Sequence, residues 1–267
     1  MQFDTHSLAA LSPQQARLMI RQGEWLKPTA GLCTGYTQAN LAILPKAWAF
    51  EFLLFCQRNP KPCPLLDVTD IGSPIPKMVA TDADLRTDIP QYRVYRHGEL
   101  SDEVTSLAPL WQEDWVGFLL GCSFTFEHPL LAEGIPVRHI EQQRNVPMYI
   151  SSIPCQEAGP FHGTMVVSMR PMTPAQAIRA VQITSRFPSV HGAPVHIGDP
   201  AAIGISDLDS PDFGDAVDCK PGEIPVFWAC GVTPQAVAIQ SKIPLMVTHA
   251  PGHMLICDVK DSAYAVL

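Results

Sequence analysis

The chain has no run of lysine and arginine, and its formal net charge is −8 over 267 residues. Binding the phosphates of DNA or RNA requires a basic face, so this charge balance argues against a nucleic-acid partner. Charged residues make up 16% of the chain, below the usual fraction of about a quarter. So few charges indicate extensive burial or a surface shared with a second copy, and a homo-oligomer is therefore an expectation.

Signals that would direct the chain to or across a membrane are also missing. Residues 1–15 show neither the basic region nor the apolar core of a secretory signal. The longest strongly apolar stretch, Trp115–Phe126, is too short to cross a bilayer. We therefore expect a cytoplasmic protein that does not bind membranes and whose eight cysteines are reduced. There is no C-x-x-C pair, so no structural zinc site is expected.

Proline is abundant, with 26 residues, and predicts many short elements closed by rigid turns. Ser12 and Thr173 each precede a proline and have a glutamine three positions later, which predicts two helix starts with capping boxes. Thr233 also precedes a proline and is expected to cap a third helix. There Gln235 stands one position earlier than in the other two, so its side chain is free of the cap.

The order of apolar runs and helices predicts an α/β fold. Pro225–Cys230 is almost continuously apolar, as in a strand covered on both faces of a parallel sheet. A helix and a second apolar run, Pro244–Thr248, follow, and such a unit normally forms a parallel, right-handed crossover. We predict a main domain from residues 1–133 and 210–267, with a mostly parallel sheet and flanking helices. Residues 134–209 are expected to form a smaller, inserted two-layer α+β domain.

Other elements are expected from local patterns. Ala47–Cys56 reads as a helix, and Trp111–Leu120 as a buried helix or a strand. Pro28–Asn40 is rich in small and turn-forming residues. Further short strands are predicted at 65–68, 92–95, 146–150, 165–169 and 195–197.

Two loops leave the carboxyl ends of predicted strands, where open α/β sheets bind their ligands. The first holds Cys230 at a helix start, a place that lowers the pKa of a thiol, beside backbone N–H groups at Gly231 that suit an anion. The second holds His249 and His253 around a tight turn, where they would serve as general acid and base. The alternatives are a buried, inert thiol and two structural histidines.

A metal site is considered at His191, His196 and Asp199, because two histidines and a carboxylate can hold iron or zinc. Gly and Pro separate the two histidines, which therefore do not share a helical face. We expect no metal there and no cofactor elsewhere. The stretch Gly121–Glu127 places a thiol, a hydroxyl and a carboxylate close together without forming a G-x-S-x-G elbow.

Several long segments resemble one known family. They are PTAGLCTGYTQAN (28–40), FCQRNPKPCPL (55–65), ADLRTDIPQYRVY (83–95), FLLGCSFTFE (118–127), NVPMY (145–149), VVSMRP (166–171), HGAPVHIGDP (191–200), PDFGD (211–215), PVFWACGVTPQ (225–235) and THAPGHM (248–254). Together they resemble the bacterial YcsI-like hydro-lyase family, which is related to a domain of mitochondrial D-glutamate cyclase. The resemblance covers nearly the whole chain. It implies a two-domain structure and a lyase that adds or removes water.

D-Glutamate cyclase interconverts D-glutamate and 5-oxo-D-proline plus water, so the resemblance implies a small carboxylate or amino-acid substrate. For such a reaction we assign His249 and His253 as base and acid, with Cys230 as an alternative catalytic group. The Thr233 hydroxyl and the backbone from Gly231 to Gln235 would stabilise an oxyanion. An arginine would hold the α-carboxylate. The candidates for the remaining substrate contacts are Arg138, Arg86, Arg170, Tyr36 and Ser123.

Three other functions stay open at this level. A different hydro-lyase would dehydrate another small carboxylic acid, with a metal or an iron–sulfur cluster. A binding protein would use the same pocket to sense an amino acid or lactam without turnover. An acyl transferase or isomerase would act through the Cys230 thiol.

Overall fold

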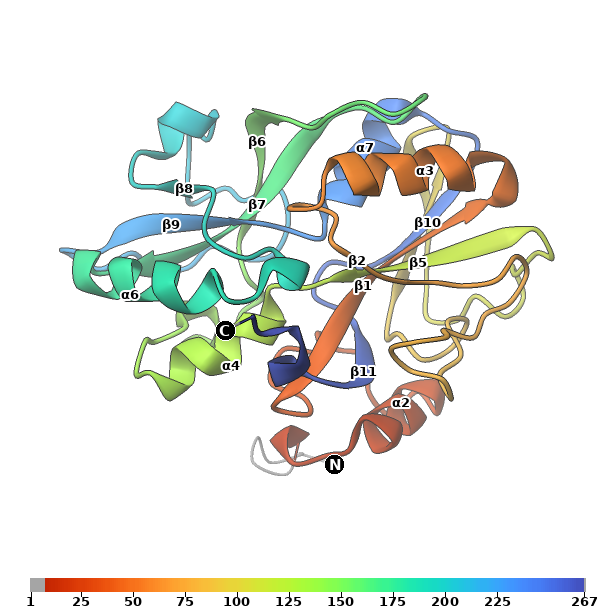
Figure 1. Ribbon diagram of the computed structural model, residues 1–267, viewed down its shortest axis with the longest axis horizontal. Coiled ribbons are helices and arrows are strands. Elements are labelled where there is room, and N and C mark those ends of the chain that lie inside the picture. The colour runs from red at the N-terminus through yellow and green to blue at the C-terminus, as the bar shows by residue number, and fades with distance from the viewer. Residues whose placement is uncertain (1–7, 267) are drawn as a thin grey trace.

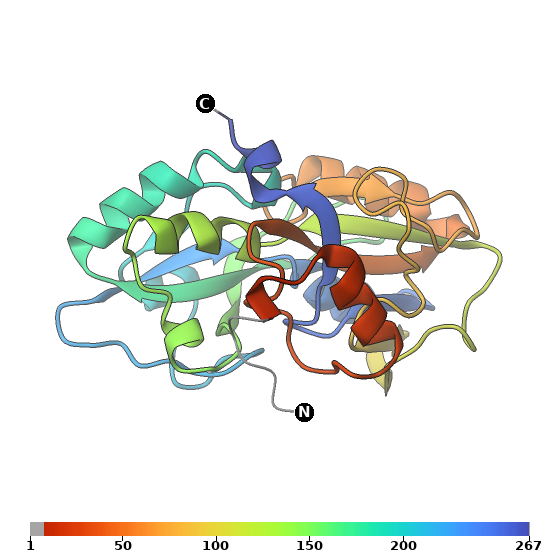
Figure 2. The ribbon, with the colours of Figure 1, turned by 90° about the horizontal axis from the view of Figure 1, so that it is seen from below.

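The computed structural model describes residues 8–266, which form two antiparallel β-sheets around a shared apolar core (Figures 1 and 2). Sheet A has seven strands in the order β2-β5-β1-β10-β3-β4, with β11 also paired to β1. They are β1 (Tyr36–Pro45), β2 (Leu65–Val68), β3 (Tyr92–Arg96), β4 (Glu99–Val104), β5 (Trp115–Gly121), β10 (Met246–His249) and β11 (Leu255–Lys260). Sheet B has the order β6-β7-β9-β8, with β6 (Met148–Pro154), β7 (Thr164–Met172), β8 (His196–Ile197) and β9 (Ile224–Ala229).

Helices cover the outer faces of the sheets. In Figure 2, α4 (Phe124–Ala132) and α6 (Pro174–Thr184) lie side by side on one face of sheet B. The other face of sheet B shares its core with α3 (Lys46–Arg58) and with strands of sheet A. The remaining helices are α2 (Pro13–Arg21), α5 (Arg138–Glu141), α7 (Thr233–Ser241) and the 3₁₀ turns η1 (Pro188–Val190), η2 (Pro200–Ile203) and η3 (Asp261–Tyr264).

Strand β1 is the centre of sheet A because it pairs with β5, β10 and β11. Its alternating side chains enter two different cores. Ala42 and Leu44 face the core shared with sheet B, whereas Leu41 and Ile43 face the core beneath residues 79–89. Both faces of β1 are therefore buried, which explains its long apolar run.

The predicted mostly parallel sheet is wrong. All strand pairings among residues 8–266 are antiparallel. The expected parallel crossover fails because β9 lies in sheet B and β10 in sheet A, so α7 links two sheets. The apolar runs misled the prediction for a physical reason. A strand that is buried on both faces has a continuously apolar sequence. Here helices and long loops cover both faces of antiparallel strands, which therefore show the same pattern.

Local signals predicted the elements better than the topology. The capping boxes at Ser12 and Thr173 are both present. Trp111–Leu120 resolves as a strand, β5. Helix α7 begins one residue earlier than expected, with Val232 as its N-cap, so Gln235 is the third helical residue and still makes no cap. Strand β1 begins at Tyr36, inside the segment predicted as turn-rich. The first side chains that it buries are polar, so the sequence there does not read as a strand.

Residues 134–209 contribute β6, β7, β8 and α6 to the structure. Sheet B is completed by β9, which comes from the later segment 210–267. Among residues 8–266, none of the helices has the length and apolar character of a membrane span. All eight cysteines are free thiols, as expected.

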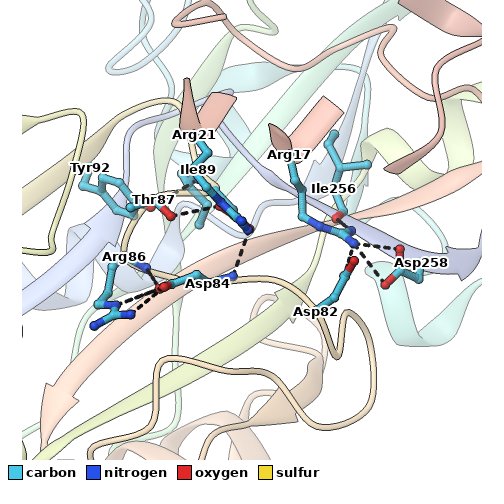
Figure 3. A network of polar contacts seen from close by, with 11 residues as sticks. Arg17, Arg21, Asp82, Asp84, Arg86, Thr87, Ile89, Tyr92, Ile256 and Asp258 are labelled. Atoms are coloured by element: carbon cyan, nitrogen blue, oxygen red, sulfur yellow. Dashed lines mark hydrogen bonds and ion pairs between the residues drawn. The ribbon is translucent and has the colours of Figure 1, made fainter. Parts of the chain in front are cut away.

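A network of polar contacts attaches helix α2 to sheet A (Figure 3). The Arg17 side chain is buried and donates to the Ile256 carbonyl oxygen at 2.7 Å and to Asp258 at 3.0 Å. It also forms an ion pair with Asp82. One turn later, Arg21 binds the buried Asp88 carboxylate through two nitrogens, at 2.8 and 2.7 Å. The network therefore joins α2 to β11 and to the loop before β3.

We expect Arg17→Met to lower the free energy of unfolding by about 3 kcal/mol, because Asp258 loses its buried cationic partner and the Ile256 carbonyl loses the Arg17 donor. Urea denaturation of both proteins measures this difference. Lys77→Met is the matched control, since Lys77 and Asp70 form an exposed pair, 55% and 70% accessible, worth at most about 1 kcal/mol. Equal effects of the two substitutions would contradict the network's role.

Candidate functional site

A recess of about 70 Å³ lies where the loop before β1 meets the first turns of α4. Its walls come from three distant parts of the chain. Tyr36 and Gln38 come from β1, Glu127 from α4, and Asp261 from η3. The loop Gly31–Gly35 closes one side. Two acidic residues, Glu127 and Asp261, thus line one small recess.

Thr29 fixes the loop that closes the recess. The Gln38 amide nitrogen donates to the Thr29 carbonyl oxygen at 2.9 Å, and the Thr29 hydroxyl lies 2.7 Å from the Gln38 amide oxygen. The Thr29 N–H donates to the Gly252 carbonyl at 2.8 Å, and the Met254 N–H donates to the Thr29 hydroxyl at 3.0 Å. The loop therefore rests on the segment between β10 and β11.

Glu127 is a buried carboxylate held by two basic side chains. Arg170 donates to it through Nε at 3.1 Å and also through Nη2. His139 Nε2 lies 3.2 Å from the same carboxylate oxygen. Burial alone would raise the pKa of Glu127, but the charges and hydrogen bonds of His139 and Arg170 outweigh burial and lower the pKa to about 2. Glu127 is therefore ionised throughout the physiological range.

Arg170 is itself fully enclosed. It donates to the hydroxyls of Ser168 and Ser123, each at 3.1 Å. Its guanidinium lies over the rings of Phe126 and Trp228, 5.4 Å from each centroid. These contacts compensate a buried cation and fix the position of Glu127 against sheet B.

Asp261 has the opposite environment. Only 6% of the residue is accessible, and its one side-chain hydrogen bond among residues 8–266 comes from the Thr37 hydroxyl at 3.3 Å. Burial raises the pKa of Asp261 to about 7, although Thr37 and Lys260 act to lower it. Near neutral pH this carboxyl group is partly protonated. Carboxyl groups whose pKa values are pushed apart in one recess can divide the roles of anion and acid.

The structure brings the two predicted catalytic loops together but uses their side chains internally. The Gln235 amide nitrogen donates to the His249 carbonyl at 2.7 Å, and the Tyr95 hydroxyl donates to the Gln235 amide oxygen at 3.3 Å. The Thr233 hydroxyl donates to the Cys230 carbonyl at 2.7 Å. It also accepts the Val166 N–H at 3.1 Å, so it is satisfied within the fold.

The thiol and the glycine of the first loop are buried. Burial raises the pKa of Cys230 to about 11, opposite to the lowering expected at a helix start. Gly231 is required by close packing, because a Cβ there would lie 1.9 Å from the Asn40 amide nitrogen. Neither residue lines the recess.

His249 and His253 lie outside the recess. His249 is 1% accessible, and its Nδ1 faces the Leu41 N–H at 3.1 Å and the Leu41 carbonyl at 3.2 Å. Its Nε2 has no partner among the described residues. Burial lowers the pKa of His249 to about 4. Half-buried His253 places Nδ1 3.0 Å from the Pro251 carbonyl, and burial lowers its pKa as well.

The three arginines expected to hold a carboxylate are all occupied. Arg86 grips Asp84, with Nη2 2.7 Å from the carboxylate (Figure 3). Arg138 binds Glu223 at 2.6 Å and Glu141 at 3.0 Å. Arg170 is bound to Glu127, as described. Of the expected substrate contacts, Tyr36 lines the recess, and Ser123 and Arg170 stand behind its wall.

The residues considered for a metal lie apart from the recess. His191 Nδ1 is 2.8 Å from the Lys61 carbonyl, and His196 Nε2 is 2.7 Å from the Asp199 carbonyl. No group of three metal-ligating side chains with suitable geometry occurs in the part of the chain that the structure describes.

The two acidic residues of the recess were not predicted to act together. Glu127 was visible only as the carboxylate of the stretch Gly121–Glu127, and Asp261 carried no signal at all. Asp261 follows Lys260 at an unremarkable strand end. Its importance arises from tertiary burial beside β1, which no local pattern records.

Comparison with known proteins places the chain among its relatives. The model of the D-glutamate cyclase family matches residues 116–258. A protein of Bacillus licheniformis named "Putative hydro-lyase" is 65% identical to this chain, and the match covers 96% of this chain and 98% of the relative. The chain belongs to this family. "Putative hydro-lyase YcsI" of Bacillus subtilis is 60% identical over 96% of this chain and 100% of its own. The family resemblance drawn from the motifs is therefore confirmed.

The environment of Asp261 predicts a pH dependence of stability. An aspartate pKa raised from 3.8 to about 7 means that the folded state binds the proton more tightly. The proton therefore stabilises the folded state. This stabilisation is complete below the pKa of Asp261 in the unfolded chain and is lost as pH rises through its pKa in the folded protein. As pH rises from 4 to 8, we expect the free energy of unfolding of Asp261→Asn to increase by about 1–3 kcal/mol relative to that of the unsubstituted protein.

Chemical denaturation at several pH values measures this change. Asp209→Asn is the control, because Asp209 is exposed. The unsubstituted protein and the Asp261→Asn variant should diverge with rising pH, whereas the control should follow the unsubstituted protein. Parallel profiles for all three would show that Asp261 is not held in an unfavourable site.

Proposed function

We propose that this protein is a hydro-lyase for a small carboxylic acid, and that water is added or removed in the recess formed by Glu127 and Asp261. The observation that carries the proposal is that Glu127 and Asp261 line one recess, with the pKa of Glu127 lowered by its basic partners and the pKa of Asp261 raised by burial. The names of the relatives, hydro-lyase and D-glutamate cyclase, support the same class of reaction.

The reaction we propose first is the interconversion of D-glutamate with 5-oxo-D-proline and water. The amine nitrogen attacks the γ-carboxyl carbon, and a carbon–oxygen bond of that carboxyl group breaks. Two protons leave the ammonium group and depart with the carboxyl oxygen as water, while the lactam nitrogen keeps one. No oxidant or reductant is required. The enzyme must hold the ammonium group, move protons and stabilise a tetrahedral intermediate.

The two carboxyl groups suit two of these tasks. A permanently ionised Glu127 would bind the substrate ammonium group and keep it near the γ-carboxyl carbon. Asp261, with a pKa near neutrality, would accept a proton from the nitrogen and deliver it to the departing oxygen. Its half-titrated state at working pH favours transfer in both directions.

Proton NMR of the purified protein, incubated separately with D-glutamate, L-glutamate and both 5-oxoprolines, tests the reaction. We expect conversion confined to the D pair. Conversion of a different carboxylic acid in a wider substrate screen would keep the hydro-lyase and replace the substrate. Saturable binding of these compounds with no turnover of any acid would instead identify a binding protein and overturn the proposal.

Variants test the assignment of roles. With the substrate so identified, we expect Glu127→Gln and Asp261→Asn each to lose at least ~100-fold in turnover. In the unsubstituted protein, turnover in the dehydrating direction should rise as pH rises through about 7, where Asp261 loses its proton and can accept one from the nitrogen. Residual activity of Asp261→Asn should lack this rise.

His249→Gln provides the competing test, because His249 was the base predicted from sequence. We expect its turnover to stay within about tenfold of the unsubstituted enzyme, with circular dichroism confirming that each variant is folded. A folded His249→Gln variant that is as inactive as Glu127→Gln would move the chemistry to the loop after β10.

A further inference from the structure

A second, larger cavity opens directly beside the recess. It measures about 430 Å³, within the range of about 300–1,000 Å³ typical of ligand pockets. The cavity lies between α4 and α6, which are neighbours on sheet B in Figures 1 and 2. It shares Gly35, His128 and Asp261 with the recess. The two spaces therefore adjoin at Asp261, one as an inner recess and the other as an outer groove.

One face of α6 forms a wall of the outer groove. Arg179, Gln182 and Ile183 line it at the spacing of neighbouring positions on a helix, and Arg186, in the turn that follows α6, extends the same wall. Ile183 is buried against the core below, so this wall is apolar at its base and basic at its rim. The outer groove thus offers apolar contact to a carbon chain and positive charge to its end.

The two arginines of this wall differ in their partners. Arg179 crosses the outer groove to Glu133 on the α4 side, at 2.6 Å, and its charge is thereby balanced. The Arg186 guanidinium has no acidic partner among residues 8–266. Its backbone is fixed, because the Val266 N–H donates to the Arg186 carbonyl at 2.7 Å. In a chain of net charge −8, an arginine that lines a cavity and has no acidic partner among the described residues favours an anion.

We propose that Arg186 is the carboxylate anchor of the substrate. The outer groove then binds the part of the molecule that does not react, while the reacting end enters the inner recess. This inference rests on the proposed function, because it assigns the substrate as a dicarboxylate that places one carboxylate at Arg186 and the other beside Asp261. The arginines first expected in this role, Arg86, Arg138 and Arg170, are already bound to acidic side chains.

The two cavities also separate the charges of such a substrate. The Glu127 charge is balanced by Arg170, whereas Arg186 has no acidic partner among residues 8–266, so the unreactive carboxylate is directed toward Arg186. The end that approaches Asp261 meets a group that is protonated at mildly acidic pH and donates a hydrogen bond to it. A dicarboxylate should therefore bind in one orientation.

Binding of glutarate tests the anchor without any reaction. Glutarate has two carboxylates and no amine, so it cannot cyclise, and calorimetric titration at pH 6 measures its affinity directly. We expect Arg186→Gln to weaken glutarate binding at least ~10-fold, the loss typical of a charge-assisted hydrogen bond to a carboxylate. Arg186→Lys keeps the charge and should recover part of this loss.

Arg96→Gln is the matched control, since Arg96 is an exposed arginine at the end of β3 that lines neither cavity. The anchor is supported if Arg96→Gln binds glutarate like the unsubstituted protein and Arg186→Gln does not. It is overturned if the unsubstituted protein shows no saturable binding, or if both variants bind equally well. Glutarate binding that depends on Arg186, in a protein that turns over no acid, would refute the proposed reaction and leave the anchor standing.

Once a substrate is identified, steady-state kinetics provide a second test of the role of Arg186. Arg186→Gln should raise KM at least ~10-fold and leave kcat nearly unchanged, because the anchor contacts substrate and transition state alike. An equal fall in kcat would assign Arg186 to the chemical step instead.

Discussion

The buried ion pair between Arg170 and Glu127 connects the two halves of the molecule. Arg170 belongs to β7 in sheet B, and Glu127 belongs to α4, the helix that leaves sheet A after β5. A buried pair of this kind repays its desolvation only when its hydrogen bonds are complete. Ser123 and Ser168 accept hydrogen bonds from Arg170, and His139 lies 3.2 Å from the Glu127 carboxylate. These contacts hold the position of Glu127 beside the recess.

The same ion pair separates the chemistry of two similar groups. Glu127 and Asp261 are both buried carboxyl groups, and burial alone raises the pKa of each. Only Glu127 has basic neighbours close enough to reverse this effect. The difference between an ionised carboxylate and a protonated one is therefore set by partners within about 3 Å, not by the residue type. A recess with both forms can hold a cation and exchange a proton in one place.

Local sequence signals predicted local structure well. The helices begun at Ser12 and Thr173 depend on neighbouring residues alone, and so do most of the short strands. The direction of strand pairing was not available from the same signals, because β9 and β1 are buried on both faces for reasons that lie elsewhere in the chain. The same contrast between local signals and long-range contacts applies to the candidate site. The loops around Cys230 and His249 do meet, but the burial that occupies their side chains became visible only in three dimensions. The pairing of Asp261 with Glu127 depends on contacts between remote segments and left no local trace.

The position of β11 has a consequence for how the site forms. Its partner β1 stands early in the order of strands, and Arg17 of α2 binds its backbone, yet β11 is the last strand of sheet A and leads directly into Asp261. The recess can therefore close only after contacts of very long sequence separation are made, and such contacts form slowly. A partly folded chain with sheet B complete and β11 undocked would hold Glu127 without Asp261. Assembly of the recess therefore waits for β11 to dock, and a molecule that has not completed sheet A lacks the acid–base pair.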